Sequence, residues 1–318
     1  LIFYVAFVYG LLPGMFLTLV AYYYFIKYTK EKHWYQLVIS ALSINLAILL
    51  IGNNLIHLLA IFAVAVIYFI RNKDWKIIAF ILSCVFLMSA SKSVITNYYE
   101  VKSQKEIAEG VPKITWIAMG MQEGEREAGW WNRFNYDIMP EEEYDTKRIT
   151  EISKTSMKQR LNVFRDNPKY AFDFYKRKYE NQFIEPTFQS LLVTAPQRNF
   201  SNETTLEKIR DFFVKQIYFN HTHTVLEFIM KVFQVFVYLF TFVFAVVMYK
   251  RKNEFFAIIP IAFIGGTLFN MIWEAKSRYI FPYFVFLIPL TAYGLVIVRN
   301  KIKEYKKLKE GKDEKSTI

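Results

Sequence analysis

The sequence predicts an α-helical polytopic membrane protein of about seven transmembrane helices, with a mostly helical, partly β extracytoplasmic domain. Three observations predict this class. Hydrophobic residues make up 54% of the 318 residues, more than the roughly 45–50% of an ordinary soluble domain. Many of them lie in uninterrupted runs long enough to cross a bilayer. A long polar segment, residues 97–224, separates these runs into two groups.

Each expected span is an apolar run, since a transmembrane helix needs about 20 mostly apolar residues. The run at 34–70 contains no charged residue and is too long for one span. Gly52-Asn53-Asn54 divides it into two antiparallel helices joined by a tight turn. The seven spans are expected within residues 1–26, 34–70 (two spans), 77–95, 225–249, 255–273 and 280–298.

Basic residues predict the orientation, because Lys and Arg collect on the cytoplasmic side of membrane proteins. Basic clusters follow the first, third, fifth and seventh expected spans, which all end on one side if the spans alternate. The chain then divides into four spans (1–96), an extracytoplasmic domain (97–224), three spans (225–299) and a basic cytoplasmic tail (300–318). The polar segment contains as many acidic as basic residues. The excess of Lys and Arg behind the net charge of +12 therefore lies mainly in the expected cytoplasmic loops and tail, where it indicates topology. A nucleic-acid partner is not expected, because no basic domain carries a reading motif.

The extracytoplasmic segment is expected to be helical with one extended piece. Residues 98–109 continue the preceding helix, and 113–119 are β-like, bounded by Pro112 and Gly120. A polar, aromatic loop follows at 120–135. Further helices are expected at 145–165, 168–183 and 206–220.

Several classes of site are excluded by the residues present. The single cysteine, Cys84, excludes a disulfide framework and a cysteine-based zinc site. His221 and His223 lack an evident third ligand, so no metal site and no cofactor are expected. No serine-hydrolase, phosphate-loop or zinc-protease motif occurs. Because the sequence opens inside an apolar run without Met, we expect it to be the C-terminal part of a longer membrane protein.

The turn between the last two expected spans carries the main candidate site. Lys276 and Arg278 lie at the outer membrane boundary beside Tyr279, where they suit a lipid phosphate. The alternative is that they are interface anchors whose charged ends reach water, with Glu274 paired to Arg278. Lys92, near the outer end of the fourth expected span, could reach the same phosphate or extend to water in the same way.

Aromatic and amide residues of the outer segment are candidates for contact with a sugar. Trp116, Trp130 and Trp131 could stack on sugar rings, although core or interface positions are equally compatible with the sequence. The loop also holds Gln122 and Asn132, which complete the expected acceptor and sugar loop.

Three stretches carry a resemblance to a known family. They are Trp273-Glu-Ala-Lys-Ser-Arg-Tyr-Ile-Phe-Pro282 with the helix up to Gly294, residues 110–120 with 129–132, and residues 183–190. The chain resembles the C-terminal half of bacterial polyprenyl-phosphate-sugar-dependent glycosyltransferases of the GT-C fold. These are relatives of protein O-mannosyltransferases and aminoarabinose transferases, in glycosyltransferase family 39.

The resemblance implies an enzyme of the bacterial plasma membrane that moves a sugar from polyprenyl phosphate to a glycan, lipid or protein acceptor. A carboxylate acts as general base in such enzymes, and basic side chains stabilise the leaving phosphate. In the family that carboxylate lies in the first outer loop, which this chain is expected to lack, so Glu274 is only a substitute candidate.

Other readings of the sequence stay open. A polysaccharide polymerase or ligase would also need outer basic residues that contact a lipid phosphate. A lipid-linked-sugar transporter or flippase would carry polar residues and broken helices near the bilayer midplane, whereas these runs are largely apolar. A non-catalytic membrane scaffold is the remaining reading.

Overall fold

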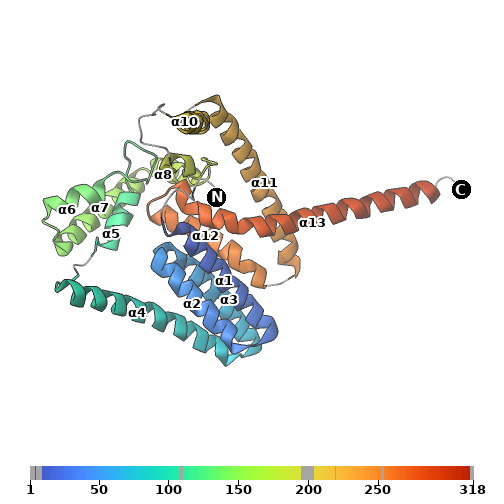
Figure 1. Ribbon diagram of the computed structural model, residues 1–318, viewed down its shortest axis with the longest axis horizontal. Helices are drawn as coiled ribbons and strands as arrows, with labels where there is room; N and C mark the ends of the chain where they lie inside the picture. Colours follow the sequence, from blue (N-terminus) through green and yellow to red (C-terminus); the bar gives the residue numbers. More distant parts are fainter. Residues whose placement is uncertain are drawn as a thin grey trace. The chain divides into compact units, whose positions relative to one another are not determined.

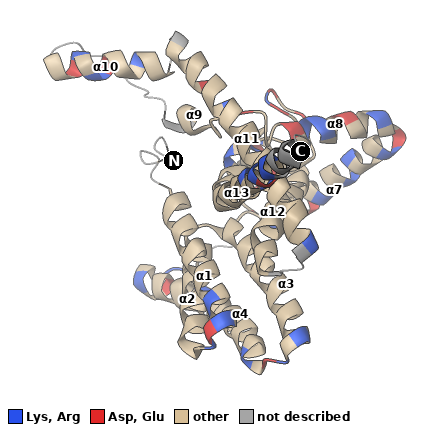
Figure 2. Ribbon diagram, turned by 90° about the vertical axis from the view of Figure 1, so that its right-hand side faces the viewer, with Lys and Arg blue, Asp and Glu red and all other residues tan. Residues whose placement is uncertain are grey.

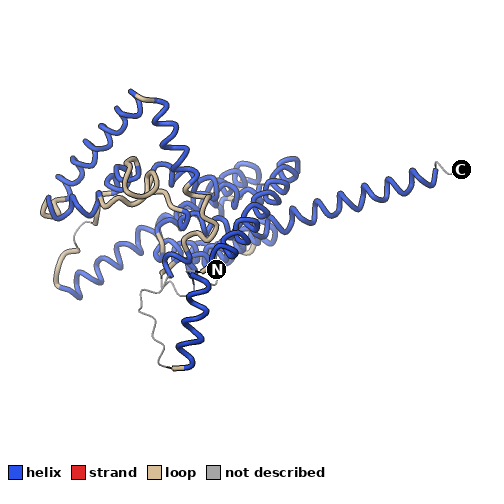
Figure 3. The backbone as a smooth tube through the Cα atoms, turned by 90° about the horizontal axis from the view of Figure 1, so that it is seen from above, coloured by secondary structure: helices blue, strands red, loops and turns tan. Residues whose placement is uncertain are grey.

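The computed structural model describes residues 4, 9–107, 110–194, 204–218, 220–251 and 254–315. In this part of the chain all regular structure is helical and no strand occurs (Figure 3). Parts of four expected elements lie outside the described residues: 1–3 and 5–8 of the first span, 108–109 and 219 of the outer helices, and 316–318 of the tail. The chain forms two compact units, one of Leu1–Thr194 with Ile261–Pro282 and one of Ala195–Pro260 with Tyr283–Ile318.

The first unit begins with a group of apolar helices, in which α1 packs along α2 and α3 contacts both (Figure 1). The long helix α4 contacts α2 and α3. The chain turns from α2 to α3 through a short 3-10 helix at Gly52–Asn54, which confirms the expected division of the 34–70 run. The elements are α1 (Leu11–Glu31), α2 (Trp34–Leu50), α3 (Leu55–Asn72) and α4 (Trp75–Ser103).

The same unit contains the helices of the polar segment. The expected helices at 145–165 and 168–183 are confirmed, with Asp145 capping the first and Asn167 the second. A small core of Met121, Ala128, Phe164 and Phe174 lies among them. The elements are α5 (Lys113–Gly120), α6 (Phe134–Glu141), α7 (Thr146–Asp166), α8 (Pro168–Glu180) and α9 (Ser190–Thr194).

The β-like prediction for residues 113–119 is wrong, because this segment is helix α5. Its buried residues, Thr115, Ala118 and Met119, recur at helical spacing. The Thr115 hydroxyl bonds to Ser153 of α7 at 3.0 Å. A lone extended segment would leave its backbone N–H and C=O groups without a partner strand, whereas a helix satisfies them internally.

The second unit contains α10 (Thr205–Tyr218), α11 (His221–Arg251) and the part of α13 (Ser277–Lys315) from Tyr283 onward. Helix α10 confirms the expected helix at 206–220 in its described part. Helix α12 (Ile258–Ile272) belongs to the first unit from Ile261, as does the start of α13. Helix α13 continues beyond the expected last span into the basic tail.

Five helices in the described residues are long and apolar enough to cross a membrane, which is fewer than the seven expected spans. They are Gly52–Asn72, Trp75–Ser103, Thr222–Lys250, Phe255–Ile272 and Ser277–Lys307. Helix α2 is apolar but shorter, at 17 residues. Figure 2 shows charged residues along α7, α8 and α10, whereas the middles of α1 to α4 carry few.

Candidate functional site

The predicted site lies at the turn that joins α12 to α13, residues 273–276. The backbone N–H of Trp273 donates to Phe269 at 2.8 Å and closes the end of α12. The Trp273 ring stacks on Phe269 at 5.3 Å and on Trp116 of α5 at 6.3 Å between ring centroids. Trp116 therefore packs against the base of the turn, which is a structural position.

The polar, aromatic loop is held directly against this turn. The backbone N–H of Ala275 donates to the Gly129 carbonyl at 2.9 Å. Gly129 has a φ of +68°, and an added Cβ there would lie 2.6 Å from the side chain of Lys178. Only glycine meets both conditions without strain. The chain thus brings residues 120–131 to residues 273–278, although about 150 positions separate them in sequence.

Two cations and two tryptophans lie together where the loop and the turn touch, and a third cation follows them in the chain. The Lys276 ammonium lies 3.8 Å from the centroid of the Trp130 ring. The Arg126 guanidinium lies 4.8 Å from the Trp130 ring and 5.3 Å from the Trp131 ring. Arg278 follows on the first turn of α13, 5.6 Å from the Tyr279 ring. We call the group of Arg126, Trp130, Trp131, Lys276 and Arg278 the cationic site.

Arg126 was not among the predicted site residues. It lies in a run of alternating charges, Glu123 to Glu127, which is typical of a solvated surface. The neighbouring Trp130-Trp131 pair was the available signal, because a guanidinium stacks well on an indole face.

The electrostatics of the cationic site favour an anion. Partial burial together with the neighbouring Arg278 lowers the pKa of Lys276 to about 8, and Glu274 and Arg126 act on it in opposite senses. A negative ligand would relieve the repulsion among these cations. In the described residues the buried indole N–H of Trp130 has no hydrogen-bond partner.

Glu274 is enclosed rather than open to a substrate. Its side chain is 5% exposed. It accepts a hydrogen bond from the Tyr279 hydroxyl at 3.0 Å and another from the backbone N–H of Trp131. Burial raises the pKa of Glu274, against the effect of Tyr279, Lys276 and Arg278. The carboxyl group therefore ties the loop to the turn.

The amides predicted to belong to the site shape the loop from within. Asn132 donates to the Gln122 side chain at 3.1 Å and accepts from the backbone of Phe134 at 3.1 Å. Gln122 in turn donates to Ser156 of α7 at 2.9 Å. Both amides are satisfied by neighbours in the loop, at the start of α6 and in α7.

A buried lysine, missed in the sequence, supports the loop from behind. Lys178 of α8 is 0% exposed, and its ammonium donates to the Gly120 carbonyl. Burial lowers the pKa of Lys178 to about 7, and the nearby Glu274 carboxylate opposes that shift. The sequence does contain a signal for the burial of Lys178, because this residue follows the core residue Phe174 by four positions and so lies on the same face of the helix.

Lys92 is not part of this arrangement. It lies within α4, eleven residues before that helix ends at Ser103, and its side chain is exposed. No contact joins it to the cationic site in the part of the chain that the structure describes. Lys92 was predicted to lie near the end of a span, because the helix continues beyond its apolar part as a polar segment.

Comparison with known proteins gives a family. No curated protein and no solved structure is significantly similar to this chain. One family model matches residues 7–296, which covers most of the chain, and its description is "Conserved hypothetical integral membrane protein". The match agrees with the apolar helices described above. The chain therefore belongs to this family of integral membrane proteins.

Proposed function

We propose that this protein is a membrane glycosyltransferase that moves a sugar from a polyprenyl-phosphate donor to a glycan, lipid or protein acceptor at the outer face of the bacterial plasma membrane. The observation that carries the proposal is the cationic site at the end of the apolar helix α12. There Lys276 and Arg126 both lie against the Trp130 ring, and Arg278 follows in the first turn of α13.

The chemistry of the site fits such a donor. Arginine binds phosphate oxygens with its planar fork, and lysine adds a compact charge. Negative charge grows on the departing phosphate during transfer, so nearby cations stabilise the transition state more than the ground state. Trp131, which is only partly buried, supplies flat apolar surface beside Arg126, suited to a sugar ring.

The topology that goes with this proposal has seven crossings. In it α1 and α2 cross the membrane as an antiparallel pair, in addition to the five helices named above as long and apolar enough to cross. Residues 97–224 then lie outside and the C-terminus inside. The support is the distribution of Lys and Arg, which flank the same ends of the helices.

No residue of this chain is proposed as the catalytic base, because the resemblance places that carboxylate in a first outer loop that this chain does not match. Glu274 is assigned a positioning role, because its carboxyl group already holds Tyr279 and the Trp131 backbone. A general base needs an ionised group within hydrogen-bond reach of the acceptor, and the raised pKa of Glu274 opposes ionisation.

The test is binding of polyprenyl phosphate to the purified chain, together with sugar transfer from a labelled polyprenyl-phosphate hexose by membranes of cells that express the whole gene. Lys276→Ala and Arg278→Ala should each weaken binding by about 10- to 150-fold, as expected for a lost hydrogen bond to a charged group. Arg278→Lys should restore binding only in part, because the fork is lost. Lys113→Ala, an exposed cation at the start of α5, is the matched control.

Normal binding and transfer by the Lys276→Ala/Arg278→Ala double variant at limiting donor would remove these residues from the site. A preference for a diphosphate-linked glycan over the monophosphate would instead indicate the polymerase or ligase reading.

A further inference from the structure

A second site is indicated by a groove between α2 and α4, in the first unit. The groove has a volume of about 410 Å³. Its wall is almost entirely apolar, with a lysine and a tryptophan at one end, where α2 and α4 both begin. The lining residues are Trp34, Leu37, Val38, Ala41, Leu42, Lys76, Ala79, Phe80, Ser83, Phe86 and Leu87.

The length of the groove corresponds to one leaflet of a bilayer. Along α4 its lining extends from Lys76 to Leu87. Eleven residues of α-helix rise about 16 Å at 1.5 Å per residue. The hydrocarbon core of a bilayer is about 30 Å thick, so the groove covers roughly one half of it. A lipid chain of a single leaflet therefore matches the groove from end to end.

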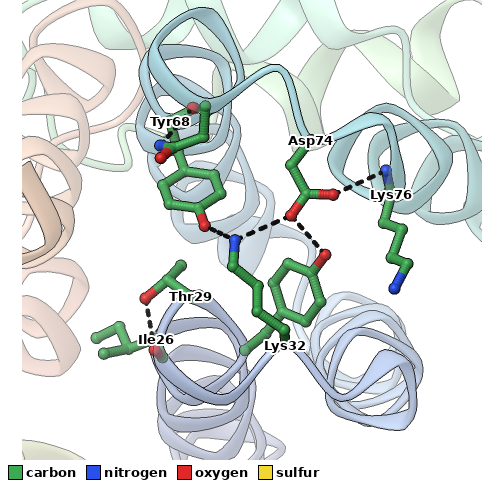
Figure 4. Close-up of polar contacts among 8 residues, drawn as sticks. Ile26, Thr29, Lys32, Tyr68, Asp74 and Lys76 are labelled. Atoms are coloured by element: carbon green, nitrogen blue, oxygen red, sulfur yellow. Dashed lines mark hydrogen bonds and ion pairs between the residues drawn. The ribbon is translucent and has the colours of Figure 1, made fainter.

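The lysine at the mouth of the groove is available to an anion. Asp74, two residues before it, already accepts hydrogen bonds from Lys32 at 3.0 Å and Tyr28 at 2.7 Å. Lys32 also donates to the Tyr68 hydroxyl. Asp74 contacts Lys76 only through the backbone N–H, at 3.2 Å, and Figure 4 shows the Lys76 side chain pointing away from the carboxylate.

The charge state of Asp74 agrees with its pairing to Lys32 rather than to the Lys76 side chain. Burial would raise its pKa, but the hydrogen bonds from Tyr28 and Lys32 outweigh burial and hold the pKa below its usual value. Asp74 is thus ionised and engaged with Lys32. In the described residues the Lys76 ammonium has no ion-pair partner, so it carries an uncompensated positive charge at the end of an apolar groove.

We propose that this groove binds one anionic phospholipid from the leaflet that faces the basic loops. An acyl chain lies between α2 and α4, the phosphate contacts Lys76, and Trp34 lies at the level of the headgroup, where tryptophan is favoured. Anionic lipids of the cytoplasmic leaflet attract basic segments that lie close to the membrane surface. This lipid site is separate from the cationic site and does not depend on the proposed transfer reaction.

The experiment measures lipid binding to the purified full chain in detergent by native mass spectrometry. The probes are phosphatidylglycerol and phosphatidylcholine with identical acyl chains. The parent protein should bind the first phosphatidylglycerol about tenfold more tightly than phosphatidylcholine. Lys76→Gln should abolish this preference and leave the weaker, headgroup-independent binding. Ala79→Trp, which fills the groove, should weaken binding of both lipids.

Matched controls separate this site from the rest of the surface. Lys73→Gln removes a cation three residues before Lys76 without altering the groove lining, and Leu82→Trp places a tryptophan on an exposed part of α4 outside the groove. Both variants should bind like the parent. Equal binding of the two lipids by the parent would overturn the proposal, and so would retention of the preference in Lys76→Gln.

Discussion

Lys178 is completely buried, although lysine side chains are usually exposed to water. Its aliphatic stem lies against Gly129, and its ammonium reaches the Gly120 carbonyl, so a single side chain contacts both ends of the loop that carries Trp130. A buried amine is costly when charged, unless it is neutralised or paired. The lowered pKa of Lys178, about 7, expresses that cost.

This cost predicts a pH dependence of stability. Unfolding returns the pKa of Lys178 to its ordinary value of 10.5. Between the two values the unfolded chain binds more protons than the folded chain, so the free energy of unfolding should rise as the pH increases above about 7. Below that pH the cost of charging the buried amine is fully present. Lys178→Met should flatten this rise, as measured by thermal unfolding in detergent between about pH 6 and 9.

The control is Lys176→Met, an exposed lysine on the same helix that pairs with Glu180 at 3.8 Å. It should keep the pH dependence of the parent. If Lys176→Met and Lys178→Met respond to pH alike, the buried amine is not the group that titrates.

At the scale of elements, close helix contacts depend on small residues. In the second unit α11 and α13 cross at Gly294, where an added Cβ would lie only 2.1 Å from the Phe240 carbonyl oxygen. Thr291 and Thr241 bond across the same crossing at 3.0 Å. Helices in a membrane gain little from the hydrophobic effect, so close backbone approach and such hydrogen bonds carry much of their association.

Gly294→Val should therefore destabilise the protein by about 1–3 kcal/mol or more, the usual cost of overpacking a tight contact. Thermal unfolding of the purified protein measures the effect. Ala292→Val, at an exposed position two residues earlier, is the matched control and should unfold like the parent. Similar midpoints for the two variants would contradict the close crossing.

At the scale of the whole molecule, the proposed topology predicts opposite accessibility for the polar segment and the tail. In a Cys84→Ala background, Glu125→Cys should react with an impermeant thiol reagent on intact cells, because residues 97–224 are proposed to lie outside. Lys307→Cys should react only after the cells are permeabilised. Both positions are exposed in the structure, so lack of reaction reflects the membrane barrier. The reverse pattern would contradict the orientation.

The helices that the sequence predicted well are those with local signals. Asp145 and Asn167-Pro168 start α7 and α8 through caps and a favourable first-turn proline. The break at Gly52-Asn53-Asn54 is equally local. Residues 113–119 lacked such a signal, and their helical conformation depends on packing of Thr115 against Ser153. The seven-span count exceeded the five long apolar helices because run length alone does not fix helix bounds.

The sequence by itself determined the membrane class and the polar segment between two groups of apolar helices, and it predicted a site at the 273–279 turn. These follow from composition and from charges beside apolar runs, which are properties of short stretches. Only the tertiary structure decided which distant residues complete the site. Arg126 and Trp130 meet Lys276 because Gly129 accepts the Ala275 N–H and leaves room for Lys178. Such contacts depend on long-range packing, so no local pattern in the chain specifies them.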